Sequence, residues 1–123
     1  MALTHATAVR NTLADAINTA VNAGAGAGKL VIMTSADVEV ATLTMSDPAF
    51  GAATSGSITA NAIADDTNAT GGTAALFKVT DSTGAEVYRG TVGTSGADLN
   101  LSSLSIAAGD TVSVTSLVYT ASA

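Results

Sequence analysis

The sequence predicts a mainly β protein, an antiparallel jelly-roll-like β-sandwich with one N-terminal α-helix. Two observations lead to this fold class. Apolar side chains recur at helical spacing before residue 22, and the chain beyond residue 29 consists of short apolar runs separated by Gly, Ser, Thr and Asp. Such runs, about seven or eight of them at intervals of about 8–14 residues, are typical of sandwiches. We therefore divide the 123 residues into a helical arm with a Gly/Ala hinge (1–28) and a β-sandwich domain (29–123).

The helix is predicted from His5 to Val21, with Thr4 as its N-cap. Apolar side chains recur every four residues along it and form one narrow stripe, which we take as the candidate interaction stripe: Val9, Leu13, Ile17 and Val21. The polar residues fall on the other faces: Arg10, Asn11, Asp15, Asn18 and Asn22. Two interpretations of the stripe stay open. It buries on a neighbouring subunit, or it covers an open face of its own sandwich.

Three glycines follow the helix and predict a hinge: Gly24, Gly26 and Gly28. A phosphate-binding loop is not indicated. Its pattern requires a glycine where Ala23 stands and a Ser or Thr where Leu30 stands. The order of elements is also reversed, because phosphate-binding loops run from a strand into a helix.

The first two strands are predicted at Leu30–Thr34 and Val38–Met45. The first is a continuous apolar run, as expected of a central strand covered on both faces. In the second, the apolar phase changes between Val40 and Ala41, which predicts either a bulge or a twist between sheets. Pro48 then ends the strand, because proline has no N–H for a sheet.

The rest of the domain begins with Phe50, which we expect to fold back into the core. Ser57–Ala64 alternates apolar and polar residues. Ala74–Thr80 and Glu86–Val92 flank a short Asp/Gly turn and predict a hairpin. The last strand is predicted at Thr111–Thr120.

Composition excludes several classes of function. Four Lys and Arg against ten Asp and Glu give a net charge of −6, so the chain lacks the cations that binding a row of phosphates requires. We therefore expect no nucleic-acid partner. We also expect no membrane partner, because neither a signal peptide nor a transmembrane run is visible. Without cysteine there is no disulfide or thiolate site.

No residue pattern indicates catalysis, a cofactor or a metal. His5 is the only histidine and lies in a terminal segment without a neighbouring nucleophile. Asp65, Asp66 and Asn68 carry oxygen ligands, but the spacing of a calcium loop is missing, so a turn is favoured. A glycosidase-type carboxylate pair is left open by the sequence. Because only four residues are aromatic, there is little to stack a sugar ring, and we expect no enzyme.

Five segments together carry a resemblance to a known family: ALTHATAVRN, GKLVIMT, EVATLTMSDPAFG, ANAIADDTNATGGTAALFKVTDSTG and IAAGDTVSVTSLVYT. The chain resembles the head cement or decoration proteins of tailed bacteriophages. This resemblance implies a jelly-roll-like sandwich on the capsid exterior, assembled in the host cytoplasm. It also implies binding to the major capsid protein and to further copies of itself, as a dimer or trimer on the shell.

Two other classes remain as alternatives. A phage tail or fibre component would share the Gly/Ser/Thr-rich β composition. A carbohydrate-binding surface module is disfavoured, because aromatic residues make up only 3% of the chain.

Overall fold

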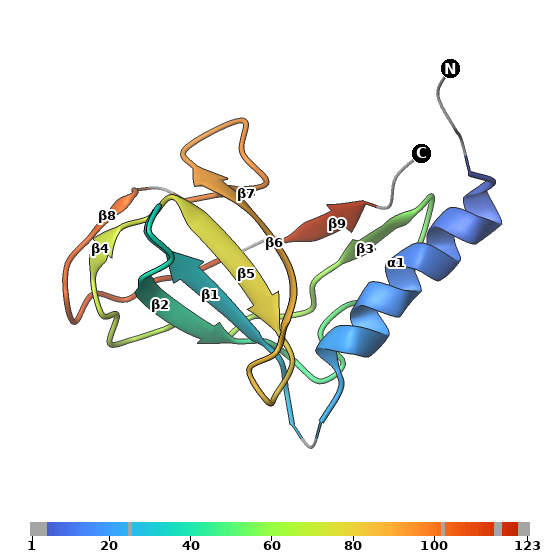
Figure 1. Cartoon of the computed structure of the whole chain (residues 1–123), viewed down its shortest axis with the longest axis horizontal. Helices are drawn as coiled ribbons and strands as arrows, with labels where there is room; N and C mark the ends of the chain where they lie inside the picture. The colour runs from blue at the N-terminus through green and yellow to red at the C-terminus, as the bar shows by residue number, and fades with distance from the viewer. Residues whose placement is uncertain (1–4, 25, 102, 115–116, 121–123) are drawn as a thin grey trace.

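The structure, a computed structural model, describes residues 5–24, 26–101, 103–114 and 117–120. It is mainly β with one helix, and its largest sheet is curled and mixed (Figure 1). The elements are α1 (Thr7–Val21), β1 (Lys29–Met33), β2 (Glu39–Thr44), β3 (Ser57–Thr59), β4 (Gly72–Thr73), β5 (Leu76–Thr80), β6 (Glu86–Gly93), β7 (Leu99–Asn100), β8 (Ser105–Ile106) and β9 (Val118–Thr120).

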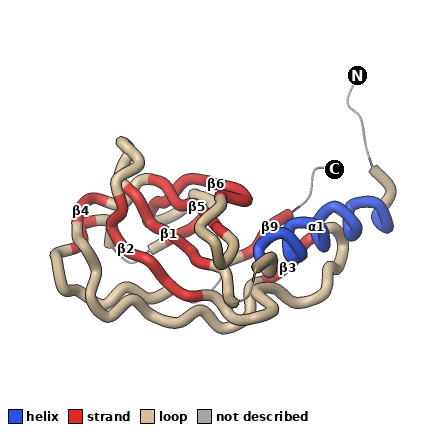
Figure 2. Tube along the Cα trace, turned by 60° about the horizontal axis from the view of Figure 1, so that its bottom comes forward, coloured by secondary structure: helices blue, strands red, loops and turns tan. Residues whose placement is uncertain are grey.

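The strands form one five-stranded sheet and two ribbons. The order in the sheet is β2-β1-β5-β6-β7, and the ribbons are β3-β9 and β4-β8. All these pairs are antiparallel, as expected, except β6-β7, which is parallel and makes the sheet mixed. Figure 2 shows α1, β3 and β9 together at one end of the molecule, with the five-stranded sheet at the other.

The predicted central strand and the bulge beside it are both confirmed. β1 lies between β2 and β5 and carries the apolar run beginning at Leu30. Ile32 pairs with Ala41 and Met33 with Glu39, which leaves Val40 as the extra residue of the bulge. Val40 and Ala41 are both buried, as the change of apolar phase requires.

The predicted hairpin is confirmed as β5 and β6, which pair in antiparallel register. Asp81 organises its turn, because its carboxylate accepts hydrogen bonds from the Thr83 hydroxyl and from the N–H groups of Thr83 and Ala85. The Thr83 hydroxyl is the main cause that holds the pKa of Asp81 below its usual value. Such Asx geometry is why Asp recurs in turns.

The second half of the chain contains shorter strands than predicted. β3 covers only the start of the predicted Ser57–Ala64, and β9 only the end of the predicted Thr111–Thr120. Phe50 is buried as expected and bridges to Ala60, so residues 50–60 form an irregular hairpin. Its turn has positive φ at Ser55 and Gly56, as a tight two-residue hairpin turn requires.

α1 begins two residues later than predicted and ends at Val21 as predicted. Its N-cap residue is Ala6, and no side chain caps it. The predicted cap Thr4 lies outside the described residues. The helix therefore gains little from its own ends, and its stability depends on tertiary packing.

Four polar side chains fasten α1 to the backbone of residues 49–56. The Oδ1 atoms of Asn22, Asn18, Asp15 and Asn11 accept hydrogen bonds from the N–H groups of Ala49, Phe50, Ala53 and Gly56 respectively, at 2.8–3.2 Å. The Asn18 amide also donates to the Phe50 carbonyl at 3.3 Å. We call these four side chains the polar ladder. It takes the place that a neighbouring strand would have along this edge of the hairpin.

The body-facing side of α1 therefore includes polar residues as well as the C-terminal half of the predicted apolar stripe. Asn11, Asn18 and Asn22 are half-buried against the body, although the sequence placed them off the stripe. Ala14 and Val21 lie on the same side and are fully buried. They join one core cluster with side chains from the sheet and the hairpin, including Leu30, Ile32, Leu43, Phe50, Ile58, Phe77, Val79, Leu99 and Leu117.

We predict that Asn18→Ala lowers the free energy of unfolding by about 1–3 kcal/mol. The change removes two hydrogen bonds with Phe50 and one with Asn22, and it leaves partly buried polar groups without hydrogen-bond partners. Urea denaturation measures this loss. The matched control is Thr19→Ala, since the Thr19 hydroxyl bonds only a carbonyl of its own helix and is exposed. Equal stability of the two variants would show that the ladder does not hold the helix.

Candidate interaction surface

The structure divides the candidate interaction stripe into two halves. Val21 is fully buried and Ile17 packs partly buried against the core. Val9 and Leu13 are 47% and 41% exposed. The interpretation in which the helix covers its own body therefore describes the C-terminal half of the stripe, whereas the N-terminal half is exposed.

One exposed side of α1 carries no charged side chain, and the exposed Asp15 lies at its edge. We call this side the outer face, and its exposed members are Ala8, Val9, Thr12, Leu13, Ala16 and Thr19. The hydroxyls of Thr12 and Thr19 donate to the carbonyls of Ala8 and Asp15 in the preceding turn. These two donors are therefore already used, and the outer face offers neighbouring molecules mainly methyl groups. A helix face exposed to water alone usually carries charged residues.

The predicted hinge glycines lie against the body. A Cβ on Gly28 would meet the Val21 side chain at 2.5 Å and the Thr80 carbonyl at 2.6 Å, so only glycine fits there. Gly24 has φ +94° and touches Ser82, whose hydroxyl donates to the Ala23 carbonyl. Gly26 is half-buried. The hinge role stays a prediction, and a hinge motion would have to break these contacts.

Two further large apolar side chains are exposed outside the helix. Val38 is 59% exposed at the turn between β1 and β2, and Val118 is 48% exposed on β9. Val38 follows Asp37, which forms an ion pair with Arg89 at 3.2 Å. Neither joins the outer face of α1, so Val38 offers a matched position for comparison with Leu13.

Within the described residues there is no group of three or more His, Asp or Glu side chains that could hold a metal ion. Asp66, singled out in the sequence, has a structural task, because its carboxylate accepts from the N–H groups of Thr42 and Asn68. This is the turn that the sequence favoured. His5 is exposed. Among the described helices none has the length and apolarity that crossing a membrane requires.

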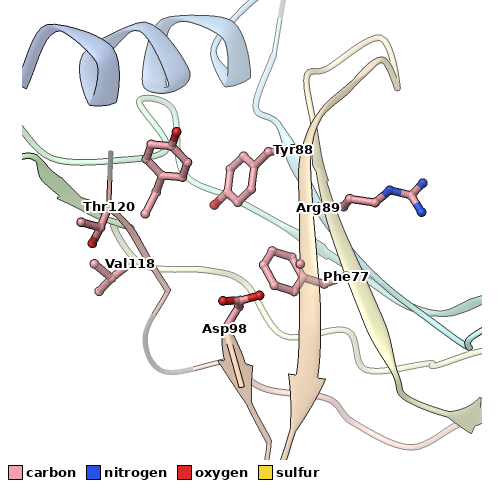
Figure 3. A pocket seen from close by; sticks show the side chains of 8 residues that line it. Phe77, Tyr88, Arg89, Asp98, Val118 and Thr120 are labelled. Atoms are coloured by element: carbon pink, nitrogen blue, oxygen red, sulfur yellow. The ribbon is translucent and has the colours of Figure 1, made fainter. Parts of the chain in front are cut away.

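An aromatic pocket lies where β6 faces β9, and the sequence did not predict it. The rings of Phe77 and Tyr88 meet edge to face with centroids 6.0 Å apart, and those of Tyr88 and Tyr119 lie 5.2 Å apart. They border a cavity of about 300 Å³ together with Asp98, Val118 and others (Figure 3). The lining comes from β5, β6, β9 and the segment before β7, so no local spacing indicates it.

Gly90 makes room for this aromatic pocket. It pairs with Phe77 across the β5-β6 hairpin, and an added Cβ would meet the Phe77 ring at 2.8 and 2.9 Å. The same Cβ would lie 2.8 Å from the Asp98 carboxylate. The ring thus covers the glycine, as aromatic residues often do in designed and natural sheets.

Comparison of the chain with models of protein families, with curated proteins and with solved structures finds no match. Membership of the cement family therefore stays a proposal, and the geometry described above is what bears on function.

We predict that Gly90→Ala destabilises the fold by about 1–3 kcal/mol, because the new methyl overlaps both the Phe77 ring and the Asp98 carboxylate. Thermal unfolding followed by circular dichroism measures the change. Gly51→Ala is the control, since its nearest neighbour would lie 3.9 Å away, and we expect it to change stability little. A neutral Gly90→Ala would show that the pocket is looser than the structure indicates.

Proposed function

We propose that this protein is a structural virion protein, a capsid cement or decoration protein that binds the outer surface of the shell of major capsid protein and stabilises the head. The observation that carries the proposal is the outer face of α1, which has no charged side chain among its members and on which Val9 and Leu13 are exposed. We place the protein on the capsid exterior, assembled in the host cytoplasm, with neighbouring copies forming a dimer or trimer on the shell.

The surface chemistry supports a binding role. Charged residues make up 11% of the chain, against about 25% in an average protein, so Thr, Ser, Asn, Gly and Ala cover much of the exterior. Small side chains permit close approach of another backbone. Their low conformational entropy also reduces the cost of ordering them in an interface.

The fold supports the same proposal. We infer that the curled five-stranded sheet and the two ribbons together are a jelly-roll-like β-sandwich, as the expected family would have. The polar ladder fixes α1 on this body. The helix then presents its outer face as a rigid binding surface, which lowers the ordering cost on association.

A cement protein stabilises a shell by mass action, because it binds the assembled form and not the free subunits. Each single contact with the shell can be weak. A copy that binds two neighbouring capsid subunits gains affinity from the high effective concentration of the second subunit. No enzymatic step is part of this role.

We predict that the purified protein sediments with assembled shells of the major capsid protein and not with unassembled capsid subunits. Particle fractionation adds a second readout, because a cement protein is found on isolated heads. Recovery on tails and not on heads would instead favour a tail or fibre component. Binding neither to heads nor to shells would contradict the proposal.

We also predict that Leu13→Glu weakens shell binding about tenfold or more, because it places a charge in a desolvated apolar contact. The same change at Val38 is the matched control, since Val38 is exposed but lies outside α1. We expect both variants to keep their free energy of unfolding within about 0.5 kcal/mol of the parent. Equal loss of binding in the two variants would show that the outer face is not the binding surface.

A further inference from the structure

The aromatic pocket between β6 and β9 concentrates a scarce residue type. The chain has two Phe and two Tyr, and three of these four line this one cavity: Phe77, Tyr88 and Tyr119. The fourth, Phe50, lies in the core. Aromatic rings carry negative π faces, and a positive charge is the group that such faces attract.

Two oxygen atoms in the pocket have unused hydrogen-bonding capacity. The Tyr88 hydroxyl oxygen is buried and has no hydrogen-bond partner among the described residues. The Asp98 carboxylate accepts from the Thr91 N–H and hydroxyl through Oδ2 alone, in the part of the chain that the structure describes. Figure 3 shows the Tyr88 hydroxyl and the Asp98 carboxylate turned toward the same space, beside Val118.

The one cation that lines the pocket does not fill it. The Arg89 guanidinium bonds Glu86 at 2.7 Å and Asp37 at 3.2 Å. Figure 3 shows this side chain on the other side of β6, directed away from the cavity. A tyrosine phenol is neutral at physiological pH, and burial, with a smaller effect of Tyr119, raises the pKa of Tyr88 further. Its oxygen therefore keeps lone pairs free to accept.

We propose that this pocket binds an alkylammonium group, the chemistry of a lysine side chain or a small primary amine. The ammonium N–H groups donate to the Asp98 carboxylate and the Tyr88 hydroxyl oxygen, while the alkyl stem lies along Phe77 and Val118. The π faces of Tyr88 and Tyr119 add cation–π attraction. A chain with net charge −6 favours a cationic ligand over an anionic one at this site. This inference is independent of the proposed role on a capsid.

Tyrosine fluorescence tests the inference directly. The chain has no tryptophan and only two tyrosines, and both line the pocket. Emission excited at the tyrosine absorption band therefore reports on this site alone. We expect n-butylammonium chloride to change the emission saturably, with an affinity that falls as salt is raised. n-Butanol, which lacks the charge, should cause no saturable change. A saturable response to butanol would overturn the proposal, and so would the absence of a saturable response to both compounds.

Two substitutions separate a binding role from a structural one. Asp98→Asn should weaken n-butylammonium binding about tenfold, because it removes the charge and keeps one oxygen for Thr91. Asp47→Asn, an exposed site with the same loss of one charge, should leave the affinity unchanged. Tyr88→Phe removes a hydroxyl that is unsatisfied in the described structure, so the fold should keep or gain thermal stability while the affinity falls. Unchanged affinity in both Asp98→Asn and Tyr88→Phe would overturn the site.

A second pair of titrations distinguishes the source of the ammonium group. A capped Ala-Lys-Ala peptide that binds more tightly than n-butylammonium supports a lysine of a partner protein, because its backbone adds contacts at the pocket rim. Weaker binding by the peptide supports a free amine. Saturable binding of methyl glucoside with no response to either amine would assign the aromatic rings to a sugar and contradict the inference.

Discussion

The polar ladder is the interaction on which the arrangement of the molecule depends. The hairpin of residues 50–60 pairs along one edge with its own return strand, and the N–H groups of its other edge need acceptors. Side chains spaced four and three residues apart on α1, from Asn11 to Asn22, supply those acceptors. A helix thereby does the work of a neighbouring strand. Its orientation about its own axis is fixed, because each acceptor must meet one particular N–H group.

This fixed orientation decides which side of α1 remains available. With the ladder, Ala14 and Val21 turned to the body, the methyl-rich side with Val9 and Leu13 is turned outward. The glycines after the helix are also part of this packing, because Gly28 lets the chain pass closely between Val21 and Thr80. The proposed binding surface is therefore a consequence of intramolecular hydrogen bonding. It requires no free movement of an arm.

Much of the local structure follows from the sequence, because it depends on neighbouring residues. The helix, the bulge at Val40 and the β5-β6 hairpin each have a local pattern of apolar spacing or turn residues. Apolar spacing located Ile17 and Val21, which pack against the body, but it did not show that α1 also packs through polar side chains. The asparagines from Asn11 to Asn22 also recur at helical spacing, but their partners lie 27 to 45 residues away. The aromatic pocket was missed similarly, since Tyr119 meets Tyr88 only through tertiary structure.

The central claim is that α1 is a fixed part of the subunit. Its inner side packs against the body, and its outer face is exposed. Native-state hydrogen exchange of the free protein tests this claim most directly. The account predicts that the amides of α1 and the donors to the ladder, including Phe50 and Gly56, exchange slowly and together, with protection near that of β1 and β5. Rapid exchange throughout α1 and residues 49–56, with β1 and β5 still protected, would show a detached arm and contradict the account.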